Sequence, residues 1–139
     1  MMRKLDQRGV AALEFCLVAV PLFTLMFVIF DLGRYAITAQ SLRTLANAGA
    51  RAMMINCYTP AAINKTSPSG CTTDYLSATD KQLAAPFLYS NGSSAPPTVS
   101  TTAGASALTV TASQPSFTMI MPIWGTALNA PSASISIPF

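Results

Sequence analysis

Few side chains in this sequence could carry out chemistry, and their placement limits what that chemistry could be. The chain has no histidine, which removes Ser-His and Cys-His nucleophile pairs, imidazole zinc ligands and the commonest general base. Asp74, Asp80, Lys65 and Lys81 could act as acids or bases, but no motif or spacing joins them. The sequence therefore predicts no enzyme, no metal site and no cofactor.

Among the ionisable side chains, Glu14 differs from the others because it lies in an apolar stretch. From Val10 to Phe30, every residue except Glu14, Pro21 and Thr24 is apolar. At about 1.5 Å per residue, a helix of this length spans roughly 30 Å, the thickness of a bilayer's hydrocarbon core. An ionised carboxylate inside hydrocarbon costs on the order of 2.5–3.5 kcal/mol, so an intramembrane acid is a functional candidate. Glu14 is near the polar edge, however, and could instead reach back to Arg8 or to lipid headgroups.

The residues around the apolar stretch distinguish three kinds of N-terminus. A cleaved secretory signal has a shorter apolar stretch, of about 7–15 residues, and ends at a small-residue site. Here the longer stretch is followed by Asp31-Leu32-Gly33-Arg34-Tyr35, which offers no such site. A lipoprotein cysteine would not precede most of the apolar run, as Cys16 does. We therefore expect one membrane span at residues 10–30, preceded by basic residues at Arg3, Lys4 and Arg8.

The junction between the basic tail and the span, Arg8-Gly9-Val10-Ala11-Ala12-Leu13-Glu14-Phe15, resembles the leader junction of type IV pilin-like proteins. The closer likeness is to the TadE/TadF-like minor pseudopilins of the tight-adherence (Flp) pilus system. Three further features support it: Pro21 within the span, the Asp31-Leu32-Gly33-Arg34 exit, and the stretch Ala46-Asn47-Ala48-Gly49-Ala50-Arg51-Ala52. Together these features cover roughly residues 8 to 55.

This resemblance implies that a membrane-embedded prepilin peptidase cleaves between Gly9 and Val10, leaving a mature chain that begins at Val10. In such assemblies the acid equivalent to Glu14 pairs with the N-terminus of a neighbouring subunit. The implied function is that of a minor pseudopilin with a structural role in assembling a surface pilus. Its implied partners are the membrane, the peptidase, other pilins or pseudopilins and the pilus assembly platform. The implied location is the bacterial inner membrane, with the N-terminus in the cytoplasm and the C-terminal domain in the periplasm.

The resemblance leaves open whether the protein enters the filament, sits at its tip or primes assembly. The alternative function is a single-pass, membrane-anchored binding domain that keeps its N-terminus. Nucleic acid is not an expected partner, because most of the Lys and Arg residues lie scattered along the chain up to Arg51 and form no basic patch. No charged residue follows Lys81. The C-terminal part of the chain therefore fits neutral contacts with other subunits better than the attraction of charged ligands, and it is also compatible with a passive anchor domain. No small-molecule substrate is expected.

An amphipathic helix is expected to extend the span over residues 31–56. Small residues at Ala39, Ala46 and Gly49 would allow close approach to another helix or to a sheet, either in this chain or in a neighbouring subunit. The apolar positions follow alternating spacings of three and four, typical of one helix face: Leu32, Tyr35, Ala39, Leu42, Ala46, Gly49 and Met53.

Cys57 and Cys71 bracket a loop rich in Thr, Pro and Ser. If the basic leader stays in the cytoplasm, this loop faces an oxidising compartment, where disulfides persist. A disulfide closing about 15 residues stabilises a domain by roughly 3 kcal/mol. Two cysteines without histidine supply too few ligands for zinc, so we expect a Cys57–Cys71 disulfide.

The rest of the chain predicts a small β-rich domain. Thr79 and Gln82 have the spacing of a capping box, which predicts a short helix through Ala85 that Pro86 stops. Alternating apolar residues then predict three or four antiparallel strands, around residues 99–101, 108–112, 117–121 and 135–139. The expected fold is α+β and type IV pilin-like, a long N-terminal helix packed on a small antiparallel sheet. Its expected parts are a leader (1–9), a transmembrane helix (10–30), an amphipathic extension (31–56) and a disulfide-stapled extracytoplasmic domain (57–139).

Overall fold

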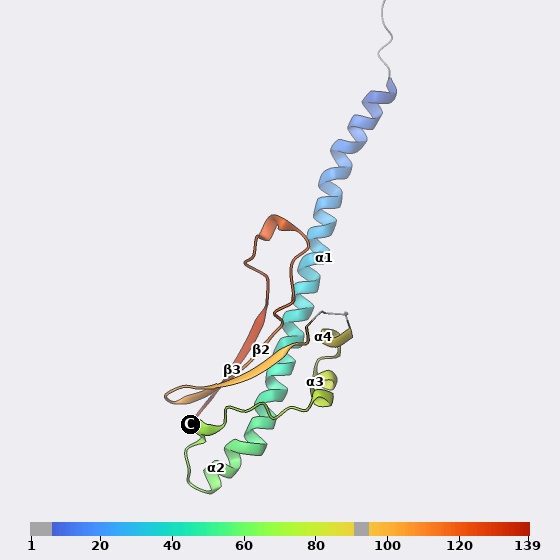
Figure 1. Ribbon diagram of the computed structural model, residues 1–139. Helices are drawn as coiled ribbons and strands as arrows, with labels where there is room; N and C mark the ends of the chain where they lie inside the picture. Colours follow the sequence, from blue (N-terminus) through green and yellow to red (C-terminus); the bar gives the residue numbers. More distant parts are fainter. Residues whose placement is uncertain (1–6, 91–94) are drawn as a thin grey trace, which may run out of the picture.

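A computed structural model describes residues 7–90 and 95–139 of the chain (Figure 1). Its main element is a long helix, α1 (Gln7–Met53), which continues through a π-helical turn, η1 (Met54–Tyr58), into α2 (Thr59–Ile63). The N-terminal part of α1 projects beyond the rest of the structure, and the remaining elements gather around its C-terminal half (Figure 1).

The helix ends later than the sequence indicates. Residue 56 is the expected end of the extension, whereas helical structure continues to Ile63. A proline such as Pro60 usually interrupts a helix, but here Pro60 lies in the first turn of α2. Since α2 follows η1 without a break, proline removes an N–H that the continuing helix would otherwise use, and the helix leaves α geometry in the π-helical turn just before it. Cys57 therefore belongs to the helix and not to the loop.

Three antiparallel strands form one sheet in the order β1-β2-β3. These are β1 (Thr98–Ala103), β2 (Ala107–Ser113) and β3 (Ser132–Pro138). Val99 on β1 pairs with Ala112, and Val110 on β2 pairs with Ile135 of β3. Strand β2 lies in the centre, so alternate side chains along it are buried under the helix. The expected fold class, a long helix on a small antiparallel sheet, is confirmed.

The prediction of a strand around residues 117–121 is wrong. This segment alternates in polarity but has no neighbouring strand, and it belongs to the long connection between β2 and β3. Its backbone donors bond elsewhere: the Phe117 N–H donates to Gln114 O at 3.2 Å, and the Met119 N–H donates to Asn129 Oδ1 at 3.0 Å. The alternation of residue types here reflects a segment with one buried and one exposed side, and no strand in the described part of the chain forms hydrogen bonds with it.

The helix packs on the sheet through small and aliphatic residues. Gly49 is closest: a Cβ added there would lie 3.2 Å from Val110 Cγ1 and 3.3 Å from Val99 Cγ1. Gly49 thus allows α1 to pack closely against the sheet of its own chain. The sequence had left open whether this close approach is made within the chain or to a neighbouring subunit. Leu32, assigned to this face from the sequence, is exposed. The buried core contains Leu42, Leu45, Ala46, Ala50, Met53, Cys71, Ala85, Leu88, Leu108, Val110, Ala112 and Phe117.

Two short helices, α3 (Ala78–Ala84) and α4 (Pro86–Ser90), lie against the side of α1. Two 3-10 turns lie in connections: η2 (Pro68–Gly70) between α2 and α3, and η3 (Pro122–Trp124) between β2 and β3. Helix α3 starts earlier than predicted, because Ser77, and not Thr79, caps it: Ser77 Oγ accepts the Asp80 N–H at 3.1 Å. Its end before Pro86 is as expected.

Candidate functional site

The N-terminal part of α1 exposes almost all of its apolar side chains. Phe15 and Leu17 are each 70% exposed, and Phe30 is 62% exposed. Among the residues that the structure describes, one helix is long and apolar enough to cross a membrane, and no part of its most apolar window is buried within the structure. These side chains need an apolar environment supplied from outside the chain, by lipid or by other helices.

The residues with expected roles in processing and assembly lie along this exposed part of the helix. Gly9 and Val10 lie just after the start of α1 at Gln7, and both are exposed. Glu14 and the free thiol of Cys16 are also exposed. At about 1.5 Å per residue, Glu14 lies roughly 65 Å along the helix from Cys57. The structure therefore does not bring the N-terminal candidates together with the disulfide.

A main contact between α1 and the β2–β3 connection is made by Asp31, to which the sequence assigned no role beyond its place in the Asp31-Leu32-Gly33-Arg34 exit. Asp31 follows the apolar stretch directly and is only 1% exposed. Its Oδ2 accepts the backbone N–H groups of Ile120 and Met121, each at 2.9 Å. Its Oδ1 faces Nη1 of Arg34 at 3.4 Å. A buried carboxylate is costly unless it is hydrogen-bonded, and these donors satisfy it.

Aromatic contacts hold the same connection to the helix one turn further on. The guanidinium of Arg34 lies 5.4 Å from the centre of the Phe117 ring, within cation-π range. Tyr35 meets the same ring edge-on, with ring centres 6.2 Å apart. Phe117 is buried. Asp31, Arg34 and Tyr35 thus fix the β2–β3 connection beside the end of the apolar stretch; we call these three residues and Phe117 the docking cluster.

One signal in the sequence could have revealed the docking cluster. Asp31, Tyr35, Thr38, Leu42 and Leu45 follow spacings of four and three, so they share a helix face. Thr38 is 3% exposed, and Leu42 and Leu45 are fully buried. A carboxylate at the end of such a face, next to a membrane-length stretch, predicts a buried partner. Its partners are 89 and 90 residues away, so their identity is not visible in the local pattern.

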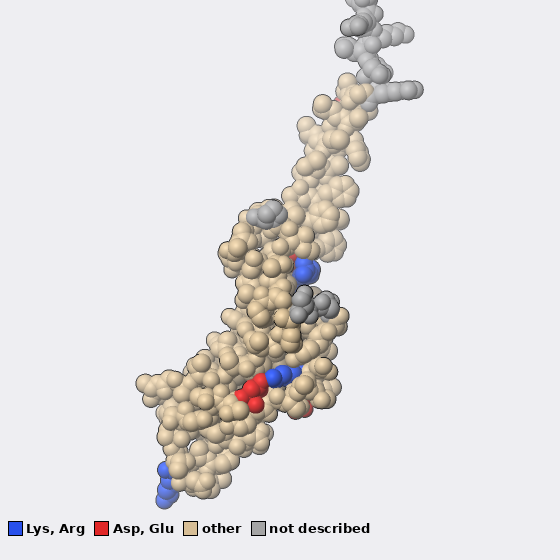
Figure 2. Space-filling model, viewed as in Figure 1, with Lys and Arg blue, Asp and Glu red and all other residues tan. Residues whose placement is uncertain are grey.

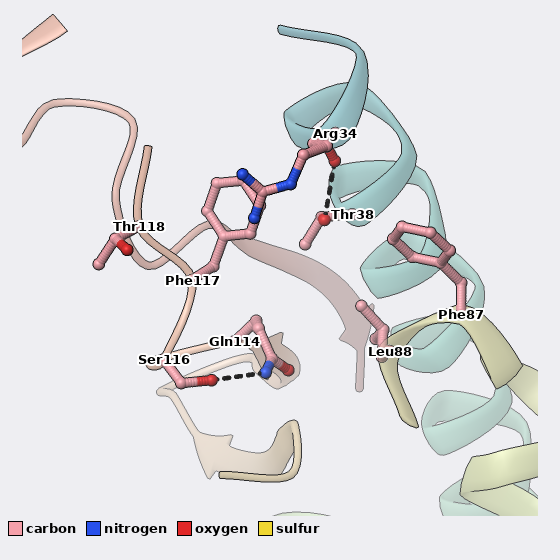
Figure 3. A pocket seen from close by; sticks show the side chains of 8 residues that line it. All are labelled: Arg34, Thr38, Phe87, Leu88, Gln114, Ser116, Phe117 and Thr118. Carbon is pink, nitrogen blue, oxygen red and sulfur yellow. Dashed lines mark hydrogen bonds between the residues drawn. The ribbon is translucent and has the colours of Figure 1, made fainter. Parts of the chain in front are cut away.

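A cavity of about 430 Å³ adjoins the docking cluster, between α1, α4 and the start of the β2–β3 connection. In Figure 3, Arg34 and Phe117 lie along one side of it and Gln114 and Ser116 along another. Gln114 Nε2 donates to Ala95 O at 3.0 Å and to Ser116 Oγ at 2.8 Å. These groups can form hydrogen bonds, but they include no nucleophile paired with a base. The described residues also contain no cluster of three metal-ligating side chains.

The two expected disulfide partners are joined at the far end of the helix. The Cys57–Cys71 bond has a Cα–Cα distance of 5.8 Å and links cysteines 14 residues apart in sequence. Cys71 is buried with Ala50, Met53 and Leu108 in one part of the core. The bond therefore ties the chain that leaves the helix back onto the core.

Comparison with known families gives a match to the N-terminal part of the chain. Residues 9–51 fit the family model of TadE-like proteins. Over this segment the chain is TadE-like. No curated protein and no solved structure matches the chain. The likeness inferred from the leader junction and the helix is therefore confirmed for the N-terminal third of the sequence.

The TadE-like segment carries both sets of helix residues described above. It contains Gly9, Val10 and Glu14 in the exposed part of α1, and Asp31 and Arg34 at the docking cluster. It ends at residue 51, before the disulfide and the sheet. The TadE-like helix thus presents an apolar surface in its first half and a domain-binding surface in its second.

Charged side chains are sparse and scattered on the face drawn in Figure 2, where no basic patch is seen.

Proposed function

We propose that this protein is a minor pseudopilin with a structural role in assembling a tight-adherence (Flp) pilus, and that a prepilin peptidase cleaves it between Gly9 and Val10. The observation that carries the proposal is the TadE-like match over residues 9–51. It begins at the residue before the proposed cleavage site and runs along a helix whose apolar first half is unburied.

Cleavage would give Glu14 a partner of opposite charge. It creates an α-amine at Val10, and an unperturbed α-amine has a pKa of about 8, so it is cationic at neutral pH. An ionised Glu14 in hydrocarbon costs on the order of 2.5–3.5 kcal/mol. Pairing with the amine of a neighbouring subunit neutralises both charges as the apolar helix moves from lipid into an assembly. Glu14 is exposed in the structure, as an intersubunit contact requires.

The proposed location is the bacterial inner membrane, with the N-terminus in the cytoplasm and the C-terminal domain in the periplasm. The disulfide between Cys57 and Cys71 supports an oxidising compartment for this domain. The proposed partners are the prepilin peptidase, other pilins or pseudopilins and the pilus assembly platform. These partners would contact the apolar surface of α1, which finds no cover within the described residues.

The intact mass of the protein extracted from membranes tests processing directly. A mature chain that starts at Val10 is expected in cells with an active prepilin peptidase, and the full chain is expected in cells without it. An unprocessed chain in both strains would contradict the proposal. That outcome would favour a membrane-anchored binding domain that keeps its N-terminus.

The role of Glu14 is tested by complementation of a deletion strain. Glu14→Ala is expected to be cleaved normally but to restore no pili. Thr24→Ala is the matched control, because it removes a polar side chain elsewhere in the same apolar stretch. Its hydroxyl donates only to Val20 O within its own helix. Normal piliation with Glu14→Ala, at wild-type protein levels, would refute the assembly role.

A further inference from the structure

The connection between β2 and β3 extends away from the sheet and runs alongside α1 towards its apolar half (Figure 1). Residues 119–124 of this connection read Met-Ile-Met-Pro-Ile-Trp. Ile120 is 71% exposed and Ile123 is 58% exposed. Two large apolar side chains, three residues apart in sequence, are therefore exposed on a segment that returns to the sheet only at Ser132.

The docking cluster sets the position of this segment relative to the apolar stretch. Asp31 is the residue immediately after Phe30, the last residue of that stretch. It holds the backbone nitrogens of Ile120 and Met121 at 2.9 Å. One residue corresponds to about 1.5 Å of helix rise. With residues 10–30 in a bilayer, Ile120 therefore lies at the level of the membrane surface.

The chemistry of the segment fits a lipid surface. The connection between β2 and β3 contains no Lys, Arg, Asp or Glu, so no unpaired charge opposes its insertion. Trp124 is the single tryptophan of the chain; it is half-buried, with its Nε1 buried, so it reports on the loop and the two isoleucines are the inserting groups. The Arg34 side chain is 45% exposed, and a guanidinium suits a phosphate group. Asp31, which contacts the segment, is already satisfied by backbone donors.

We propose that residues 119–124 form a membrane-docking loop, which inserts Ile120 and Ile123 into the boundary between headgroups and acyl chains beside the span. The partner is lipid of the leaflet on the domain's side of the membrane. The C-terminal domain then contacts the membrane at two points, the helix and the loop, which restricts its tilt and rotation. The proposal requires that residues 10–30 span a membrane, but not that the chain is cleaved or enters a pilus.

The single tryptophan makes the loop measurable in the full-length protein without labelling. The protein is reconstituted in phosphatidylethanolamine–phosphatidylglycerol vesicles in which part of the lipid carries bromine atoms, which quench indole fluorescence. Bromine near the headgroup end of the acyl chain is expected to quench Trp124 strongly, and bromine near the terminal methyl weakly.

Matched substitutions separate insertion of the loop from general effects on the protein. Replacing Ile120 and Ile123 together by Ser is expected to reduce quenching by the brominated lipid by about half or more, since these side chains supply the buried apolar area. Ile55→Ser is the control, because Ile55 is also 71% exposed but lies beyond the far end of α1. It is expected to leave the quenching unchanged.

Two results would overturn the proposal. The first is a wild-type Trp124 that brominated lipid does not quench, whether or not the aqueous quencher acrylamide reaches it. The second is protection from both quenchers that disappears when the protein is diluted with excess lipid, which would identify a second copy of the chain as the partner. Because the assay reads the unprocessed protein as well as the mature one, either result is independent of whether cleavage occurs.

Discussion

Removing the Asp31 carboxylate should release the membrane-docking loop from the helix. Asp31→Ala deletes the acceptor of two backbone hydrogen bonds and leaves the N–H groups of Ile120 and Met121 without their partner. Hydrogen bonds to charged groups contribute about 1.5–3 kcal/mol each. The contact with Arg34 adds little, because that side chain is 45% exposed and exposed ion pairs contribute about 0–1 kcal/mol.

The lower end of this range gives about 3 kcal/mol for the two bonds together. Since about 1.4 kcal/mol corresponds to a tenfold change in an equilibrium constant, opening of the loop becomes roughly 100-fold more favourable. Asp31→Asn should have a smaller effect. Both bonds go to the same oxygen, Oδ2, so an amide carbonyl could accept them. It would lose the charge, which roughly halves the strength of each bond.

Amide hydrogen exchange in detergent-solubilised protein measures this opening at the two residues concerned. Protection of Ile120 and Met121 is expected to fall roughly 100-fold in Asp31→Ala and about tenfold in Asp31→Asn. Asp74→Ala is the control, because Asp74 pairs with Lys81 at the surface, away from the loop. Unchanged protection in Asp31→Ala, or an equal loss in Asp74→Ala, would refute the reasoning.

Two further predictions concern the stability of the domain, measured by denaturant unfolding in detergent. Gly49→Leu is expected to lower the free energy of unfolding by about 1–3 kcal/mol, because its Cβ would lie 3.2 Å from a valine methyl of β2. Gly33→Leu is the control, since an added Cβ there meets nothing within 4 Å; equal stability of the two variants would contradict a tight contact. Reduction of the wild-type Cys57–Cys71 bond should cost roughly 3 kcal/mol, and replacing both cysteines by Ser should cost more, because Cys71 is buried and a serine hydroxyl is costly there. A stability that reductant leaves unchanged, while thiol titration shows the bond broken, would exclude this contribution. Cys16→Ser should have no effect, because Cys16 is an exposed free thiol.

Local sequence patterns were enough to predict the long helix and the central strand, and which face of each is apolar. The apolar stretch at residues 10–30 and the buried positions Leu42, Ala46 and Gly49 follow from helix spacing alone. The alternation around Val110 predicted the central strand, because every second residue faces the helix. For the second half of the helix and for the strand, the pattern reports which face is apolar, and the shape of a small α+β domain leaves few ways to cover that face.

Tertiary structure decided what covers each face and what happens where the local pattern is ambiguous. Residues 117–121 alternate as a strand would, but they lie against α1, where Asp31 takes two of their backbone donors. Leu32 has the spacing of the buried face yet is exposed, because the domain covers the side of the helix that Asp31 occupies. A sequence specifies that a carboxylate or an apolar side chain needs a partner; only the folded chain brings together two segments that are 89 residues apart and decides which atoms meet.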